Sequence, residues 1–326
     1  MKKKIFYWCP FIDKVATIKA VINSCCGLKR YSNNLIPVII NCFGEFDEHE
    51  KFLSRKNINV INLTKFRFIK KIPNKGFFFS RILYLTIFLF SFIPLTKLIK
   101  KEEPEYFISH LITSLPLISF NFFKFKTKHI LRISGFPKLN ILRSLLWRMS
   151  SKNIHMITCP TEGTLNILRN SGLFNTTKIF LLEDPIIDVS KLNLRKEILE
   201  EEFLKKNNYI LGVGRLTKQK NFELLIKFFL NIQKKDPEIR LVIIGEGENY
   251  KNLKNLIFKN ELQNKVFLLG YKKNVYKYMN NSKFFILSSK WEDPGFVLVE
   301  AAASRTVILS SDCPNGPKEI LSNGKN

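Results

Sequence analysis

The feature that most constrains the fold is a repeated alternation of short apolar segments with longer helical segments. Seven apolar segments of four to six residues lie in the first part of the chain, at 4–9, 38–42, 59–62, 106–109, 129–133, 156–159 and 178–182. Five more follow, at 209–213, 240–244, 265–269, 284–287 and 306–310. Runs this short and apolar are typical of strands buried on both faces, and helical crossovers fit between them. The sequence therefore predicts an α/β protein with parallel sheets.

The alternation is interrupted once, around Asp184-Pro185. The stretch 192–206 is charged, helical in pattern and poor in aromatic residues, which favours a connection between two domains. We expect each domain to be a doubly wound, Rossmann-like sheet, with a ligand cleft at the carboxyl ends of the strands. The predicted organisation is an N-terminal domain at 1–186, a linker at 187–207 and a C-terminal domain at 208–326.

The charge is strongly basic and unevenly distributed. The net charge is +26; residues 1–185 contribute 29 Lys and Arg against 11 Asp and Glu, and residues 186–326 contribute 24 against 16. A basic first half implies an anionic partner, such as a nucleic acid, an anionic membrane surface or a phosphorylated substrate. The aromatic residues lie inside apolar runs instead of between the basic residues, so no stacking platform for nucleic acid is predicted. A basic nucleic-acid-binding protein is kept as the alternative.

The six cysteines argue against a zinc site and against a disulfide framework. They show no C-x-x-C spacing and no histidine at ligand spacing. A reducing cytosol is the compartment that this pattern fits best.

The stretch 77–99 is very apolar, with 12 uncharged residues at 82–93. That run is shorter than the roughly 20 residues that a membrane-spanning helix needs. Two interpretations stay open: a helix buried in the protein, or a helix that rests in the membrane interface. The first is the ordinary interpretation of such a run, and eight basic residues around it support the second, namely Lys65, Arg67, Lys70, Lys71, Lys75, Lys97, Lys100 and Lys101. We therefore expect a cytoplasmic protein that is peripheral on the inner face of the cytoplasmic membrane.

A strand, a glycine-containing loop and a helix follow one another between Phe284 and Ala303. The first N–H groups of a helix lack intrahelical acceptors and attract anions, so the loop before Phe296 predicts a phosphate site. Glu300 lies one turn into the helix, and Glu292 lies in the loop. A carboxylate this close to a phosphate would repel it, so we expect both carboxylates to accept hydrogen bonds from sugar hydroxyls instead. The stretch therefore predicts a nucleotide-sugar pocket. The alternative is that both are surface carboxylates that stabilise the helix N-terminus.

A second candidate loop follows the first strand of the C-terminal domain. Gly214 permits close approach of a ligand to the backbone, and Arg215 and Lys220 suit a diphosphate. Gly245 ends the next strand in the same way and is predicted to line the base and ribose. The third glycine of a dinucleotide fingerprint is missing near Thr217, so NAD binding is disfavoured. The alternative is an ordinary strand-to-helix turn with surface cations.

The order of these motifs resembles the family 4 retaining glycosyltransferases. Gly-Arg-Leu-x-x-x-Lys-Asn, Leu-Val-Ile-Ile-Gly-Glu-Gly, Val-Phe-Leu-Leu-Gly-Tyr, Glu-x(7)-Glu and Ser-Ser-Asp-Cys-Pro-Asn-Gly-Pro-Lys-Glu-Ile follow one another within residues 209–324. The resemblance implies a GT-B fold, a nucleotide-diphosphate-sugar donor held by the C-terminal domain, and no metal. No cofactor is expected, and the co-substrate is expected to be a UDP-sugar.

The resemblance also implies a role for each matching residue. Arg215 and Lys220 would bind the diphosphate, Glu300 the ribose, and Glu292 would be the catalytic acid beside the donor sugar. The backbone of the donor-binding residues would complete the site, at Gly214, Gly245, Gly295, Phe296 and Val297.

The N-terminal domain matches the family less closely. His110 ends the strand at 106–109, and in the family a histidine in such a place contacts the donor sugar near the reacting carbon. His110 is therefore the second catalytic candidate; the alternative is a histidine satisfied by backbone groups. Arg132 and Lys138 follow another strand and are predicted to meet an anionic acceptor. The paired glycines common in the family are replaced by the loop 10–14.

These motifs predict transfer of a sugar to a lipid-linked or cell-envelope glycan acceptor, in surface polysaccharide or lipopolysaccharide biosynthesis. The expected partners are the nucleotide-sugar donor, that acceptor and an anionic membrane surface, with no nucleic acid. The family pattern also predicts closing helices after residue 326, so we expect the end of the C-terminal domain to be missing. A truncated, inactive nucleotide-sugar binder is the further alternative.

Overall fold

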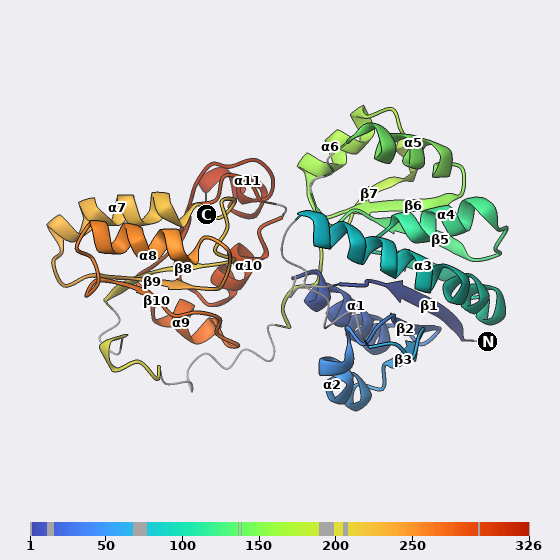
Figure 1. Cartoon of the computed structure of the whole chain (residues 1–326), viewed down its shortest axis with the longest axis horizontal. Coiled ribbons are helices and arrows are strands. Elements are labelled where there is room, and N and C mark those ends of the chain that lie inside the picture. Colours follow the sequence, from blue (N-terminus) through green and yellow to red (C-terminus); the bar gives the residue numbers. More distant parts are fainter. Residues whose placement is uncertain are drawn as a thin grey trace. The chain divides into compact units, whose positions relative to one another are not determined.

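The computed structural model describes residues 2–11, 16–67, 77–135, 137, 139–188, 199–204, 208–292 and 294–325, with the backbone alone at 77–81. The chain divides into two compact units, Met1–Pro185 and Ile186–Asn326 (Figure 1). Each unit holds one parallel sheet, so the predicted α/β class with two doubly wound sheets is confirmed.

The first unit is built on a seven-stranded sheet with the order β3-β2-β1-β4-β5-β6-β7. Every neighbouring pair of strands is parallel. The direction of winding reverses between β1 and β4, which makes this a doubly wound sheet. The strands are β1 (Lys3–Trp8), β2 (Leu35–Asn41), β3 (Asn59–Asn62), β4 (Tyr106–Ser109), β5 (Lys128–Arg132), β6 (Ile154–Cys159) and β7 (Ile179–Leu181).

Helices cover both faces of this sheet (Figure 1). Alternate side chains of a strand point to opposite faces, so Ile5 and Tyr7 of β1 pack in the cluster with α1 and α2, whereas Phe6 and Trp8 pack in the cluster with α3 and α4. The helices are α1 (Thr17–Tyr31), α2 (Glu50–Arg55), α3 (Phe77–Glu102), α4 (Ser114–Phe122), α5 (Ile141–Ser150) and α6 (Glu162–Asn170).

Helix α3 is long and continues through Pro94. Leu83, Ile87, Leu95 and Ile99 recur at helical spacing and are buried in the core of the first unit. The segment Ile82–Glu102 is nevertheless long and apolar enough to cross a membrane by length and composition alone, with 33% of the tested window buried in the protein. This apolar stretch exceeds the run at 82–93 that the sequence indicated, because Lys97 is the only charge between Ile82 and Ile99.

The second unit has a five-stranded parallel sheet with the order β10-β9-β8-β11-β12. Its strands are β8 (Tyr209–Val213), β9 (Arg240–Ile244), β10 (Val266–Leu268), β11 (Phe284–Leu287) and β12 (Val307–Ser310). Helices α7 and α8 lie on one face, and α9 and α10 on the other (Figure 1). The helices are α7 (Phe222–Lys235), α8 (Tyr250–Lys259), α9 (Tyr276–Asn281), α10 (Phe296–Ala303) and the short α11 (Pro317–Ile320), which the sequence pattern did not predict.

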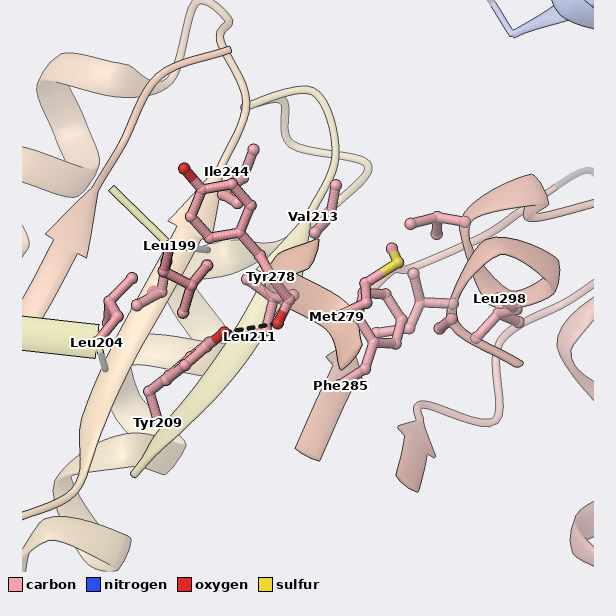
Figure 2. Packing of buried hydrophobic residues seen from close by; sticks show 14 residues of the cluster. Leu199, Leu204, Tyr209, Leu211, Val213, Ile244, Tyr278, Met279, Phe285 and Leu298 are labelled. Carbon is pink, nitrogen blue, oxygen red and sulfur yellow. Dashed lines mark hydrogen bonds between the residues drawn. The ribbon is translucent and has the colours of Figure 1, made fainter. Parts of the chain in front are cut away.

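Part of the expected linker packs into the core of the second unit. Leu199 and Leu204 are buried against β8 and α9 (Figure 2). Between them, Glu201 accepts a hydrogen bond from Tyr278 at 2.9 Å and pairs with Lys272 at 2.7 Å. These contacts anchor residues 199–204 to the second unit.

Candidate functional site

Backbone hydrogen bonds join the loops at the carboxyl edge of the second sheet. The amide N–H groups of the loops after β8 and β11 donate to carbonyls of neighbouring loops, with N–O distances of 2.8–3.1 Å. These bonds run from Gly214 to Ile244, from Leu216 to Glu246, from Lys290 to Gln219 and from Glu292 to Pro314. The loop backbone is therefore held in place without help from a ligand.

Two glycines permit this close packing. A Cβ atom on Gly245 would lie 1.9 Å from the carbonyl oxygen of Gly214, and one on Gly316 would lie 1.8 Å from that of Pro294. Gly316 also has a φ of +89°, which side chains disfavour. Gly245, predicted from sequence to line the donor pocket, is thus required for contact between the first two loops of the site.

The structure brings Lys220 and Glu292 together at the centre of this edge. Lys220 lies in the loop after β8, and its Nζ lies 2.5 Å from Oε1 of Glu292 in the loop after β11. Ser289 donates a hydrogen bond to the same oxygen at 2.5 Å. Both partners are largely withdrawn from water, with 14% of the Lys220 side chain and 5% of the Glu292 side chain exposed. A charge pair with this geometry fixes the lysine ammonium while leaving two of its three N–H donors for other acceptors.

The N-terminus of α10 lies directly after this pair. The N-cap residue Gly295 adopts a left-handed conformation with φ +86° and has no side chain that could cap the helix. The amide groups of Phe296 and Val297 thus begin a helix whose N-terminal partial charge attracts anions. Glu300 lies one turn farther, and the Tyr276 hydroxyl donates to its Oε1 at 3.4 Å. The edge thus combines a cation, a helix N-terminus and a second carboxylate.

Arg215 lies on the same edge and is exposed. It lines a hollow of about 390 Å³ together with Lys218, Gln219, Asn249, Asn252 and Trp291. Gln219 donates to the Trp291 carbonyl at 3.0 Å, which ties the Arg215 loop to the residue that precedes Glu292. Among the described residues, Arg215 has no ion-pair partner, so its guanidinium is available to a ligand.

His110 of the first unit follows β4 and is almost fully buried. Its ring stacks on Tyr7 with 6.0 Å between the centroids. Neither ring nitrogen has a hydrogen-bond partner in the part of the chain that the structure describes. Burial, and next the positive charge of Arg132, lower the pKa of His110 to about 3. The imidazole is therefore neutral at physiological pH and can donate or accept one further hydrogen bond.

The two predicted acceptor residues differ in outcome. Arg132 is 2% exposed; it donates to the Leu182 carbonyl at 2.6 Å and pairs with Asp184 at 2.8 Å. The structure thus uses Arg132 to join β5 to the end of β7, away from solvent. Lys138 lies outside the described residues.

Sequence reasoning missed two residues that position the predicted carboxylates. Ser289 orients Glu292, and Tyr276 contacts Glu300. The Ser289 signal was its place directly after a buried strand, in the same loop as Glu292. Tyr276 gave no signal, because it comes from another helix and reaches Glu300 only in the folded chain.

The comparisons with known proteins agree with this geometry. Residues 195–326 match the model of the family described as glycosyl transferases group 1. A solved glycosyltransferase from Rickettsia africae superposes with a TM-score of 0.73 at 16% identity, over 98% of this chain and 81% of that one. The Anabaena protein HepE, solved with UDP, superposes with a TM-score of 0.65 at 14% identity, over 98% and 82%. The fold is therefore that of these two-sheet glycosyltransferases.

Curated relatives point the same way. An uncharacterized glycosyltransferase of Methanocaldococcus jannaschii is 32% identical over 69% of this chain and 60% of its own length. A Campylobacter jejuni enzyme that transfers N-acetylgalactosamine to a diphospho-undecaprenol-linked sugar is 37% identical over 51% of this chain and 44% of its own. The chain spans 60% or less of the length of the first curated relatives that it matches.

Proposed function

We propose that this chain is a family 4-type retaining glycosyltransferase. It transfers a sugar from a nucleotide-diphosphate-sugar, with UDP as the expected carrier, to a lipid-linked or cell-envelope glycan acceptor. The observation that carries the proposal is the cluster of Lys220, Glu292 and Ser289 directly before the N-terminus of α10, where the N-cap residue is Gly295. The Anabaena protein solved with UDP supports the choice of nucleotide.

The reaction places a departing diphosphate at this edge. The bond between the anomeric carbon and the diphosphate oxygen breaks, the acceptor oxygen bonds to that carbon, and the acceptor proton leaves with the phosphate. Arg215, Lys220 and the amide groups of Phe296 and Val297 would stabilise the charge that develops on the phosphate. These groups supply the positive charge without a metal ion.

Three further residues would orient the donor. Glu300, one turn into α10, would accept hydrogen bonds from the ribose hydroxyls. Glu292 would hold both Lys220 and a hydroxyl of the transferred sugar. The neutral imidazole of His110, whose ring nitrogens have no hydrogen-bond partner among the described residues, would hydrogen-bond the sugar near its reacting carbon.

The acceptor and the place of action belong to the same proposal. The Campylobacter jejuni relative acts on a polyprenol-linked sugar, which supports a lipid-linked acceptor and a role in surface polysaccharide or lipopolysaccharide assembly. Such an acceptor places the enzyme on the inner face of the cytoplasmic membrane as a peripheral protein.

Calorimetric titration with UDP tests the nucleotide site. Glu300→Ala should weaken UDP binding roughly 10- to 100-fold, because two hydrogen bonds to a charged acceptor are lost. Glu238→Ala, at the opposite edge of the sheet before β9, is the matched control and should bind as wild type. Equal UDP affinity in wild type and Glu300→Ala would refute the ribose assignment.

Sugar transfer is tested with labelled nucleotide-sugars and a membrane extract as the acceptor source. Label is expected in the lipid fraction with one donor of the panel. Binding of duplex DNA measured alongside, at two salt concentrations, addresses the basic surface. Salt-sensitive DNA binding without UDP binding would show that the chain is a nucleic-acid-binding protein instead.

A further inference from the structure

Helices α3, α4 and α5 form one layer on the first sheet and carry apolar side chains on their outer side. α4 packs against both α3 and α5, so the three helices lie side by side (Figure 1). None of the residues discussed below belongs to the nucleotide site of the second unit.

The outer side of α3 is an apolar stripe. Leu85, Leu89 and Ile93 recur every four residues and are 59–62% exposed. This spacing puts them on one line along the helix, opposite the residues buried against the sheet. Residues that face water on a soluble helix are normally polar, so the stripe indicates a partner.

The outer side of α5 repeats this arrangement. Leu142, Leu145 and Met149 are exposed, whereas Trp147, on the opposite side of the helix, is buried in the core. Phe122, the last residue of α4, is 76% exposed between the two stripes. We call these seven residues the outer face: Leu85, Leu89, Ile93, Phe122, Leu142, Leu145 and Met149. An exposed apolar surface spread over neighbouring elements marks a protein or membrane contact.

Basic residues surround the outer face. Lys97 and Lys100 continue the α3 stripe toward the helix C-terminus, and both are exposed. Exposed Lys124 and Lys126 follow α4, and exposed Arg148 lies on α5. The acidic groups at this edge are engaged by lysines: Glu102 pairs with Lys4 at 2.6 Å, and Glu103 with Lys126 at 3.5 Å.

We propose that the outer face binds the surface of an anionic lipid bilayer, with α3 and α5 lying in the plane of the interface. Apolar side chains enter the boundary between headgroups and acyl chains, and the surrounding lysines and arginines contact anionic headgroups. Helix α3 does not span the bilayer in this arrangement, because Leu83 and Ile87 of the same helix are committed to the protein core.

Charge selects a bilayer over a second copy of the chain as the occupant. Residues 1–185 carry 29 basic and 11 acidic side chains, so two such units would repel each other across a shared interface. Binding to an anionic membrane instead becomes about fivefold tighter for each lysine that lies near the membrane surface. The inference supports the proposed lipid-linked acceptor but does not depend on sugar transfer, because lipid binding needs no donor.

Vesicle flotation of the full chain tests the proposal. The protein should float with vesicles of phosphatidylcholine containing about one third phosphatidylglycerol, and far less with phosphatidylcholine alone. The double variant Leu89→Glu/Leu145→Glu should bind the anionic vesicles about 100-fold more weakly, because two apolar anchors are lost and two negative charges gained. Both positions are exposed, so the fold should be retained, as circular dichroism will check.

Phe258→Glu is the matched control. Phe258 is an exposed apolar residue on α8 of the second unit, so this variant should bind vesicles as wild type. UDP titration of the double variant separates the two proposals, since UDP affinity should stay unchanged even if vesicle binding is lost. Wild-type flotation of the double variant would overturn the inference. So would a wild-type dimer without vesicle binding that the double variant dissociates, because the outer face would then be a contact between copies.

Discussion

Each unit of this protein has a buried ion pair at the carboxyl edge of its sheet, and the two pairs differ in what surrounds them. In the first unit, Arg132 and Asp184 lie 2.8 Å apart with side chains 2% and 6% exposed. In the second unit, Lys220 and Glu292 lie 2.5 Å apart, and 14% of the lysine side chain remains exposed. Each pair joins the end of one strand, or the loop after it, to the loop that follows another strand.

The difference lies in the groups that remain available. Arg132 pairs with Asp184 and donates to the Leu182 carbonyl, and its Nε and Nη2 atoms, which make no hydrogen bond within the described residues, are buried away from solvent. Among the described residues Lys220 has one carboxylate partner, and the pair lies directly before the N-terminus of α10, whose N-cap is Gly295. A buried ion pair by itself is therefore poor evidence for a site. What distinguishes the proposed binding pair from the enclosed one is that its cation is partly exposed and that a helix N-terminus, which attracts anions, lies beside it.

The largest expected effect comes from breaking the structural pair. Arg132→Met leaves the Asp184 carboxylate buried without its partner and should lower the free energy of unfolding by about 3–5 kcal/mol. Thermal and urea unfolding measure this, with UDP affinity followed in parallel and expected to stay constant. Lys128→Met, at the exposed start of the same strand, is the control and should change stability little. An Arg132→Met protein that is fully stable but defective in acceptor binding would reverse the comparison.

Breaking the second pair should act on catalysis instead of stability. In the proposed reaction, Lys220→Ala removes a cation that would stabilise the charge developing on the leaving diphosphate, so kcat for sugar transfer should fall about 100- to 1000-fold. Steady-state kinetics with the identified donor measure this. Lys227→Ala, on the exposed side of α7 and outside the lining of the hollow, is the matched control and should remain close to wild type. Normal turnover in Lys220→Ala would show that this pair, too, is only structural.

The contrast between the pairs also shows how far the sequence reaches. The strands and most helices follow from apolar runs bounded by turn residues, and β3, β8 and β11 begin and end where the sequence predicted. The proximity of Lys220 and Glu292 could be predicted because both lie in loops that follow strands of the same parallel sheet. In such a sheet, the carboxyl ends of the strands meet at one edge.

The rest depends on contacts that local sequence does not encode. The enclosure of Arg132 requires Leu182 and Asp184, some fifty residues later in the chain. The apolar residues of α5 fit a helix, but nothing in their spacing tells which of them the sheet will cover. α11 was not predicted because it has only four residues, Pro317–Ile320, and a segment this short shows no helical period.

A pH titration sharpens the comparison at His110, the candidate of the first unit. Its folded pKa of about 3 lies below the unfolded value of about 6.5, so the unfolded chain binds the extra proton between these values. The contribution of the neutral, buried His110 to the free energy of unfolding is fully present above pH 6.5 and is lost as the pH falls toward 3. Between pH 6.5 and pH 5, the free energy of unfolding should therefore fall by about 2 kcal/mol less in His110→Asn than in wild type. Urea unfolding at the two pH values measures this difference.

His129 shares the lowered pKa of about 3 through burial, so part of the acid sensitivity should persist in the His110→Asn variant. His155→Asn, on the exposed side of β6, is the control and should leave the pH profile unchanged. An identical profile in wild type and His110→Asn would mean that His110 is accessible to protons in the native protein. In that case its neutral role toward a sugar would fail.

The smallest expected effect compares a glycine of each unit. Gly27 lies inside α1, and a Cβ added there would meet no atom within 4 Å, so Gly27→Ala should raise the free energy of unfolding by about 0.5–1 kcal/mol. Gly245→Ala should act with the opposite sign, because its Cβ would lie 1.9 Å from the Gly214 carbonyl oxygen and displace the loop that carries Arg215. Unfolding and UDP titration of both variants separate the cases. Backbone atoms occupy the space beside Gly245. If alanine were tolerated there, the loops after β8 and β9 would not be in contact, and the rigid packing described for the carboxyl edge of the second sheet would be wrong.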